Sequence, residues 1–194
     1  MTLCHRILQK EIALVKIVDM RRNVALLYVF AISSFLLFGH GIVFGMDDGP
    51  EEIVLKYCQA DLTGARLTGS TYRKLIRPLI GWKNEPGWDI TVITHSAHVI
   101  NREIMPDRAI IEVSYDNLGE VAGDDIKVSR SSENIRFVLH KKGHNWQVTA
   151  PIFPPHVLPN HIKTHFESLL NDEGDKERRK ALNNVITSLE NLQQ

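Results

Sequence analysis

The sequence predicts an α+β fold in which N-terminal helices pack on a curved antiparallel sheet and further helices follow at the C-terminus. Apolar side chains recur at helical spacing in residues 50–80, alternate with polar ones as in strands over residues 90–150, and return to helical spacing in residues 160–192. No helical pattern separates the strands, so neighbouring strands are expected to run antiparallel. With 194 residues, 43% hydrophobic and 24% charged, the chain fits one globular domain with appendages.

The N-terminal segment predicts export from the cytoplasm. Val24–Phe38 is a run of 15 residues without a charge, and two arginines, Arg21 and Arg22, precede it. A positive flank, a short apolar run and small residues after it are typical of a secretory signal. The expected cleavage site lies between Gly45 and Met46.

A helix buried in a soluble protein is one alternative for the same segment, and an uncleaved membrane anchor is the other. Residues 24–45 make 22 residues, which is long enough to span a bilayer, and the arginines before them would keep the body outside the cytoplasm. The cleaved signal and the anchor both place the body in the periplasm or outside the cell. The chain then divides into a signal peptide or anchor at 1–45, with 1–19 as an upstream extension, an α+β domain at 46–155, and a C-terminal helical extension at 156–194.

Charge and histidine spacing argue against nucleic acid and a metal ion as partners, and no cofactor is expected. Five of the 23 basic and two of the 23 acidic residues lie in residues 1–45, so the rest of the chain carries a net charge of −3. Binding to nucleic acid requires a basic patch that displaces counterions from phosphates. His161 and His165 are one helical turn apart, but no third metal ligand follows at a familiar spacing. The only membrane contact expected is through the N-terminal segment, if it stays uncleaved.

Two helices are expected before the strands. The first runs from Pro50 to about Asp61, with proline in its first turn and two acidic residues at the positive end of the helix dipole. The second is capped by Ser70 or Thr71 and has an apolar stripe over residues 72–80. Pro78 should kink or end this second helix.

The segment Gly81–Asp89 forms the seam between helices and strands. It contains two tryptophans and a Glu-Pro-Gly turn, so it must turn sharply while burying large rings. Strands are then expected at residues 90–100, 108–115, 135–139 and 146–150, with a hairpin turn at residues 141–144. The polar stretch Gly119–Glu133 is expected to be a long loop or an irregular strand.

Two helices are expected after the sheet. Asn160 caps a short one and Asp175 caps the last one. The last helix has an apolar stripe that must be buried on the body or on a second chain. This stripe makes a homodimer through the last helix one of the expected assemblies, and it consists of Leu182, Val185, Ile186, Leu189 and Leu192.

The order of elements resembles the nuclear transport factor two-like superfamily over about residues 50–150. The resemblance rests on Glu52–Tyr57 with Asp61 in the first helix, the stripe over Tyr72–Ile80, and the closing hairpin at residues 137–148. It implies a cone-shaped fold with a pocket between the helices and the concave sheet, lined by aromatic and a few polar groups. The superfamily contains isomerases, cyclases, dehydratases and many non-catalytic binding modules, so the resemblance does not give the function.

The candidate ligand-binding residues are the aromatic and charged side chains expected at this pocket. They are Tyr57, Asp61, Tyr72, Trp82, Trp88, Tyr115 and Arg136. If it is buried in an apolar cone, Asp61 could be a general base, because burial raises the pKa of a carboxyl group. The alternative is that Asp61 is a solvated helix end or the ion-pair partner of an arginine such as Arg66.

The sequence predicts an exported, non-catalytic binding module for a small apolar ligand or a protein partner. A cofactor-free acid–base enzyme of the isomerase or cyclase kind is the second hypothesis, and it requires a titratable residue deep in an open pocket. A structural or dimerisation protein is the third, with the stripe of the last helix as the dimer surface. Cys58, on the apolar face of the first helix, is expected to be a core residue.

Overall fold

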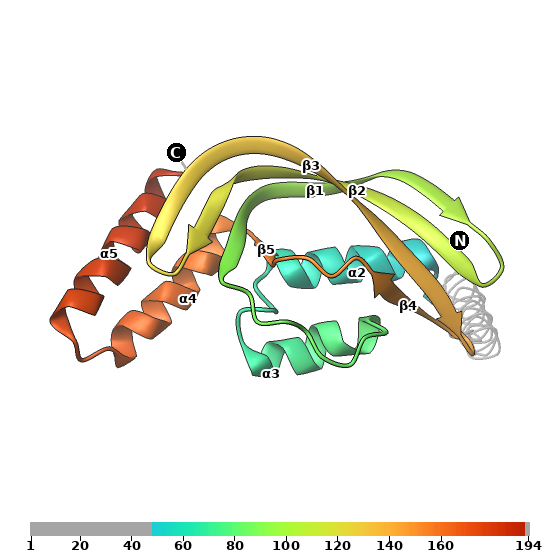
Figure 1. Cartoon of the computed structure of the whole chain (residues 1–194), viewed down its shortest axis with the longest axis horizontal. Helices are drawn as coiled ribbons and strands as arrows, with labels where there is room; N and C mark the ends of the chain where they lie inside the picture. The colour runs from blue at the N-terminus through green and yellow to red at the C-terminus, as the bar shows by residue number, and fades with distance from the viewer. Residues whose placement is uncertain (1–47, 193–194) are drawn as a thin grey trace, which may run out of the picture. The chain divides into compact units, whose positions relative to one another are not determined.

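Three long antiparallel strands form the frame of the fold and bend over the helices (Figure 1). They are β1 (Ile90–Ile104), β2 (Arg108–Ala122) and β3 (Asp125–Lys142) in a five-stranded sheet of order β4-β3-β2-β1-β5. The computed structural model describes residues 48–192, so the expected signal or anchor at residues 1–45 lies outside the described residues. The α+β class and the curved sheet that the sequence predicts are confirmed.

The first helix, α2 (Pro50–Leu62), forms as predicted and lies under the concave face of the sheet (Figure 1). Proline occupies its first turn, and Glu51 and Glu52 lie at its positive end. Its buried side chains, Val54, Tyr57 and Cys58 among them, pack against β2 and β3. The helix ends before Gly64, whose φ of 80° is a conformation that glycine adopts without strain.

The second predicted helix is distorted. It consists of α3 (Gly69–Thr71), a π-helical turn (Tyr72–Ile76) and a 3-10 turn (Arg77–Leu79). Thr68, not Ser70 or Thr71, caps it, because the Thr68 hydroxyl accepts the Thr71 N–H. The wider π turn shifts the phase of the apolar stripe, so Ile76 is buried while Leu75 is 42% exposed.

The polar stretch after Gly119 is a hairpin, so of the two expected alternatives the long loop was wrong and the irregular strand is confirmed. β2 continues to Ala122, and Ala122 pairs with Asp125 across a tight turn. The sequence pattern could not decide between loop and strand in this part of β3, because both of its faces are largely exposed, which removes the alternation of apolar and polar residues. A register shift lies between Asn117 and Gly119.

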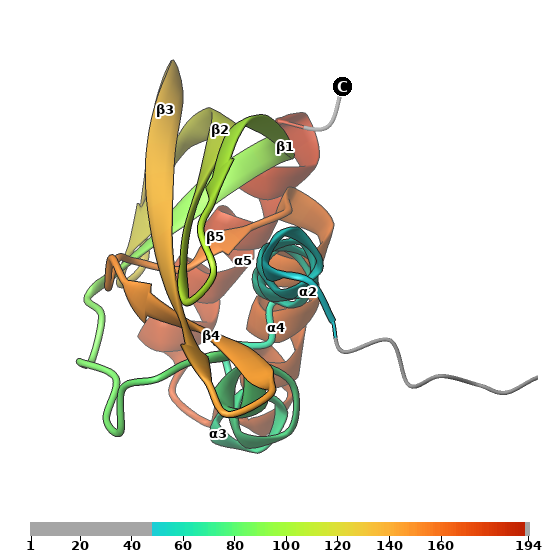
Figure 2. The ribbon, with the colours of Figure 1, turned by 90° about the vertical axis from the view of Figure 1, so that its right-hand side faces the viewer.

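β4 and β5 complete the sheet. β4 (Asn145–Ala150) returns along β3 after the predicted hairpin turn. β5 (His156–Val157), which the sequence did not predict, runs parallel to β1 with Val92 opposite His156, so the sheet is mixed rather than wholly antiparallel. β5 begins one residue after the expected domain boundary at residue 155 and joins the C-terminal helices to the sheet. Figure 2 shows α2 nearly end-on beside β5.

The C-terminal helices are α4 (Pro159–Asp172) and α5 (Lys176–Asn191). Leu158 rather than Asn160 precedes the first turn of α4, whereas Asp175 caps α5 as predicted by accepting the Arg178 N–H. Among residues 48–192, no helix has the length and apolarity needed to cross a bilayer.

Two hydrophobic clusters form the core. The first joins α2 and the distorted second helix to β2, β3 and β4, with Tyr57, Phe137 and Val148 fully buried. The second joins α4 and α5 to the other end of the sheet. Leu182, Val185 and Leu189 of the predicted stripe are buried in this second cluster, so the chain itself provides a surface for them.

Candidate binding site

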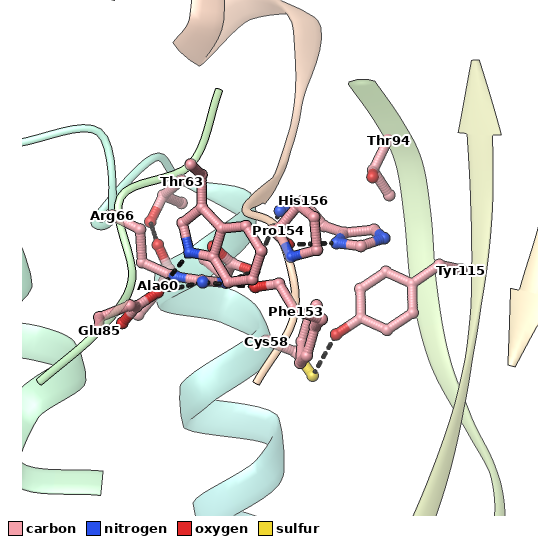
Figure 3. Close-up of polar contacts among 12 residues, drawn as sticks. Cys58, Ala60, Thr63, Arg66, Glu85, Thr94, Tyr115, Phe153, Pro154 and His156 are labelled. Atoms are coloured by element: carbon pink, nitrogen blue, oxygen red, sulfur yellow. Dashed lines mark hydrogen bonds and ion pairs between the residues drawn. The ribbon is translucent and has the colours of Figure 1, made fainter. Parts of the chain in front are cut away.

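A buried ion-pair cluster lies where α2, the turn after it and the seam loop (residues 81–89) meet. The Arg66 side chain is only 2% exposed. Its Nη1 lies 3.3 Å from Oδ2 of Asp61, the last buried residue of α2. Its Nη2 donates to the Phe153 carbonyl at 2.6 Å and also contacts Oε1 of Glu85 in the seam loop (Figure 3). Arg66 therefore ties together three segments that are distant in the sequence.

Aromatic rings surround the Arg66 guanidinium. Its central carbon lies 5.5 Å from the centre of the Phe153 ring and 5.9 Å from that of Trp88. The Trp88 indole N–H donates to the same Glu85 oxygen at 3.2 Å. Cations are attracted to the faces of such rings, more strongly where water is excluded. The seam loop is thus anchored to the body through Glu85 and Trp88 together.

Asp61 lies behind Arg66 and is fully buried. Its Oδ2 also accepts the backbone N–H of His156 at 3.1 Å, which fastens β5 to α2. Burial raises the pKa of Asp61 to about 7, although Arg66 and this N–H both lower it. Desolvation of the carboxyl is the largest cause of this rise, and the nearby Glu85 carboxylate adds a smaller one.

The His156 side chain continues the polar contacts toward the sheet. Its Nδ1 lies 2.9 Å from the Pro154 carbonyl oxygen and its Nε2 lies 3.2 Å from Oε2 of Glu133 on β3. Burial lowers the His156 pKa, and both of these oxygens oppose that change by raising it. The Tyr115 ring packs on the imidazole at 4.6 Å between centroids.

The Cys58 thiol is buried and lies 3.1 Å from the Tyr115 hydroxyl. Burial raises its pKa to about 12. The thiolate is the nucleophilic form of cysteine, so this thiol is unreactive at neutral pH. Cys58 is the core residue that the sequence predicts.

A cleft of about 690 Å³ opens beside this cluster. Tyr72 and Trp88 contribute aromatic rings to its lining, and the apolar residues Leu67, Pro86 and Pro155 add to them. The remaining lining residues are polar, charged or glycine. They are Arg66, Thr68, Gly69, Lys83, Asn84, Glu85, Gly87, Thr91 and His165.

The structure places the predicted pocket residues in four different surroundings. Tyr72 and Trp88 line the cleft, and Trp82 packs half-buried against the first cluster. Asp61, Tyr57 and Tyr115 are fully buried, the two tyrosines among core side chains that fill the space under the sheet. The placement of Arg136 was wrong: it is exposed, because it lies between the inward-facing Ile135 and Phe137 of β3.

Sequence reasoning did not select Glu85 or His156 for the site. Glu85 could have been found from its context, since a charged residue between two tryptophans in a segment that buries its rings needs a partner. His156 gave no such signal, because its role depends on β5 joining β1. Arg66 was considered as the ion-pair partner of Asp61, and that interpretation is confirmed.

Comparison with protein-family models, with curated proteins and with solved structures finds no match to this chain. Within residues 48–192, no three His, Cys, Asp or Glu side chains come close enough together to hold a metal ion. The cleft and the polar cluster behind it are therefore the candidate binding site of this chain.

Proposed function

We propose that the chain is an exported, non-catalytic binding module and that the cleft beside Arg66 holds a small amphipathic ligand. The observation that supports this proposal is the cleft lining, in which two aromatic rings face groups able to form hydrogen bonds and ion pairs. Binding sites for small molecules commonly combine apolar walls with a few fixed polar groups. Arg66 and Glu85 are such groups, since buried contacts hold both.

The state of Asp61 favours binding over acid–base catalysis. A general base must come within hydrogen-bond reach of the proton that it abstracts. Asp61 is fully buried behind Arg66, and its Oδ2 is already engaged by Arg66 and the His156 N–H. The similarity to the nuclear transport factor two-like superfamily and the export of the chain remain part of this proposal.

Native mass spectrometry of the protein recovered from the exported fraction tests the proposal. We expect a mature chain that begins near Met46 and carries a small molecule, and we expect Trp88→Ala to lose that molecule. Leu169→Ala is the matched control, because Leu169 is an exposed side chain outside the cleft lining. A ligand that Trp88→Ala retains would contradict the cleft as the site, and an uncut chain would indicate an anchor rather than a cleaved signal.

A further inference from the structure

The partners of Arg66 differ in how firmly the fold holds them. Asp61 is fixed at the end of α2, and the Phe153 carbonyl belongs to the segment that leads into β5. Glu85 comes from the seam loop, which has no helix or strand between Gly81 and Asp89. Its neighbours Asn84 and Pro86 are exposed. Glu85 is therefore the partner of Arg66 that can leave without unfolding a helix or a strand.

The charges around the cleft indicate which chemical group could replace the Glu85 carboxylate. The cleft lining contains two basic side chains, Arg66 and Lys83, and one acidic side chain, Glu85. If Glu85 turns outward, the cleft presents Arg66, the Trp88 indole N–H and Lys83, all of which are donors. Arg66 keeps Asp61 as a charged partner when Glu85 leaves, but the Arg66 and Trp88 N–H groups that contact Glu85 Oε1 then need another acceptor, because a buried donor without a partner is unfavourable.

We propose that the ligand of the cleft is an amphipathic carboxylic acid, whose carboxylate replaces that of Glu85 on Arg66 and on the Trp88 N–H. This inference rests on the proposed function and names the ligand class for the same site. Exchange of one carboxylate for another leaves the charge of the buried cluster unchanged, and Glu85 gains hydration as it leaves. The Trp88 and Tyr72 rings with Pro86 then hold the apolar part of the ligand.

Glu85 competes with the ligand in this arrangement. The apparent affinity of a site equals its intrinsic affinity multiplied by the fraction of molecules in which the site is free. Glu85→Gln removes the competing charge while keeping the shape of the side chain and one acceptor oxygen. The variant should therefore bind a carboxylate about tenfold more tightly, or better, than the wild-type protein does.

The experiment compares three probes with the same apolar chain: hexanoate, hexan-1-ol and hexylammonium. Each is titrated into the wild-type protein, Glu85→Gln and the control Glu120→Gln, and the indole N–H NMR signal of Trp88 is followed. Glu120 is a matched control, since it is a carboxylate 3.6 Å from Lys127 and is not part of the cleft lining. We expect hexanoate to bind best, and to bind more tightly in Glu85→Gln only.

The other outcomes separate this inference from the proposed function. Equal binding of hexan-1-ol and hexanoate, or hexylammonium binding that Glu85→Gln abolishes, would overturn the carboxylate while keeping the cleft as a site for amphipathic ligands. Tighter binding of hexanoate in both Glu85→Gln and Glu120→Gln would be a general effect of removing a negative charge and would also overturn the carboxylate as the ligand class. No shift of the Trp88 signal with any probe would overturn both proposals. The comparison of probes in the wild-type protein decides the ligand class even if a variant fails to fold.

Discussion

At the scale of single residues, Asp61 determines how the buried cluster responds to pH. Its pKa rises from the usual 3.8 to about 7 because the carboxyl is buried, so the folded state binds this proton more tightly than the unfolded state does. Its contribution to stability is fully present below about pH 4 and is lost as the pH rises through about 7. His156 acts in the opposite sense: its pKa is lowered, so its contribution is present above pH 6.5 and is lost as the pH falls.

Asp61→Asn should remove the first of these effects and leave the second. The free energy of unfolding of the wild-type protein, minus that of Asp61→Asn, should fall by a few kcal/mol between about pH 4 and about pH 8, at about 1.4 kcal/mol per pKa unit. Urea denaturation of both proteins across this range measures the difference, and the His156 contribution cancels in it. A difference that is constant with pH would contradict the raised pKa of Asp61.

The sequence identified part of this cluster for a physical reason. Asp61 and Arg66 are five residues apart at a helix end, a local spacing that suggests an ion pair without knowledge of the fold. Glu85 and His156 lie far along the chain, and only the seam loop and β5 bring them to the same place. Arg136 is a case in which the sequence was sufficient: the alternation along β3 already places its side chain on the other face of the sheet from that of Phe137.

At the scale of elements, the β2–β3 hairpin depends on close contact at Gly119. A Cβ atom at this position would lie 2.2 Å from the carbonyl oxygen of Lys127 on β3, and the Gly119 φ of 156° is one that other residues rarely adopt. The sequence predicts the strands that have one buried face and leaves this extension open between a loop and an irregular strand, because half-burial produces the alternating pattern and full exposure does not. The π turn was missed, since a helical stripe in the sequence assumes a regular helix.

Gly119→Ala should therefore destabilise the fold by about 3 kcal/mol, because the backbone of β3 must shift to admit the methyl group. Gly87→Ala is the control: nothing lies within 4 Å of the added Cβ, so its effect should stay within about 0.5 kcal/mol. Urea unfolding midpoints measure both. Equal midpoints for the two variants would show that β2 and β3 lie further apart at Gly119 than the structure places them.

At the scale of the whole described body, two hydrophobic clusters share the same three strands. Ile93 on β1 and Val121 near the end of β2 belong to the second cluster. Val113, earlier in β2, and Phe137, in the later half of β3, belong to the first. The polar residues Thr94, Asn117 and His156 are buried near the point where the clusters adjoin, and Thr94 donates to Asn117 at 3.1 Å. Because β1 and β2 are continuous through both clusters, loss of one cluster should release the strands that form the other.

Leu189→Ala tests this coupling from the C-terminal end. Leu189 is fully buried in the second cluster, so its truncation should cost about 2–5 kcal/mol, whereas Leu169→Ala, at a side chain that is 42% exposed, should cost much less. Two of the three tryptophans report on the other cluster, since Trp146 belongs to the first cluster and Trp82 packs against it. Helices α4 and α5 contain 14 and 16 residues against 13 in α2, so far-ultraviolet circular dichroism reports mainly on the C-terminal pair. In Leu189→Ala, both signals should shift to lower temperature together; a dichroism transition that precedes the fluorescence transition would show that the helix pair unfolds separately.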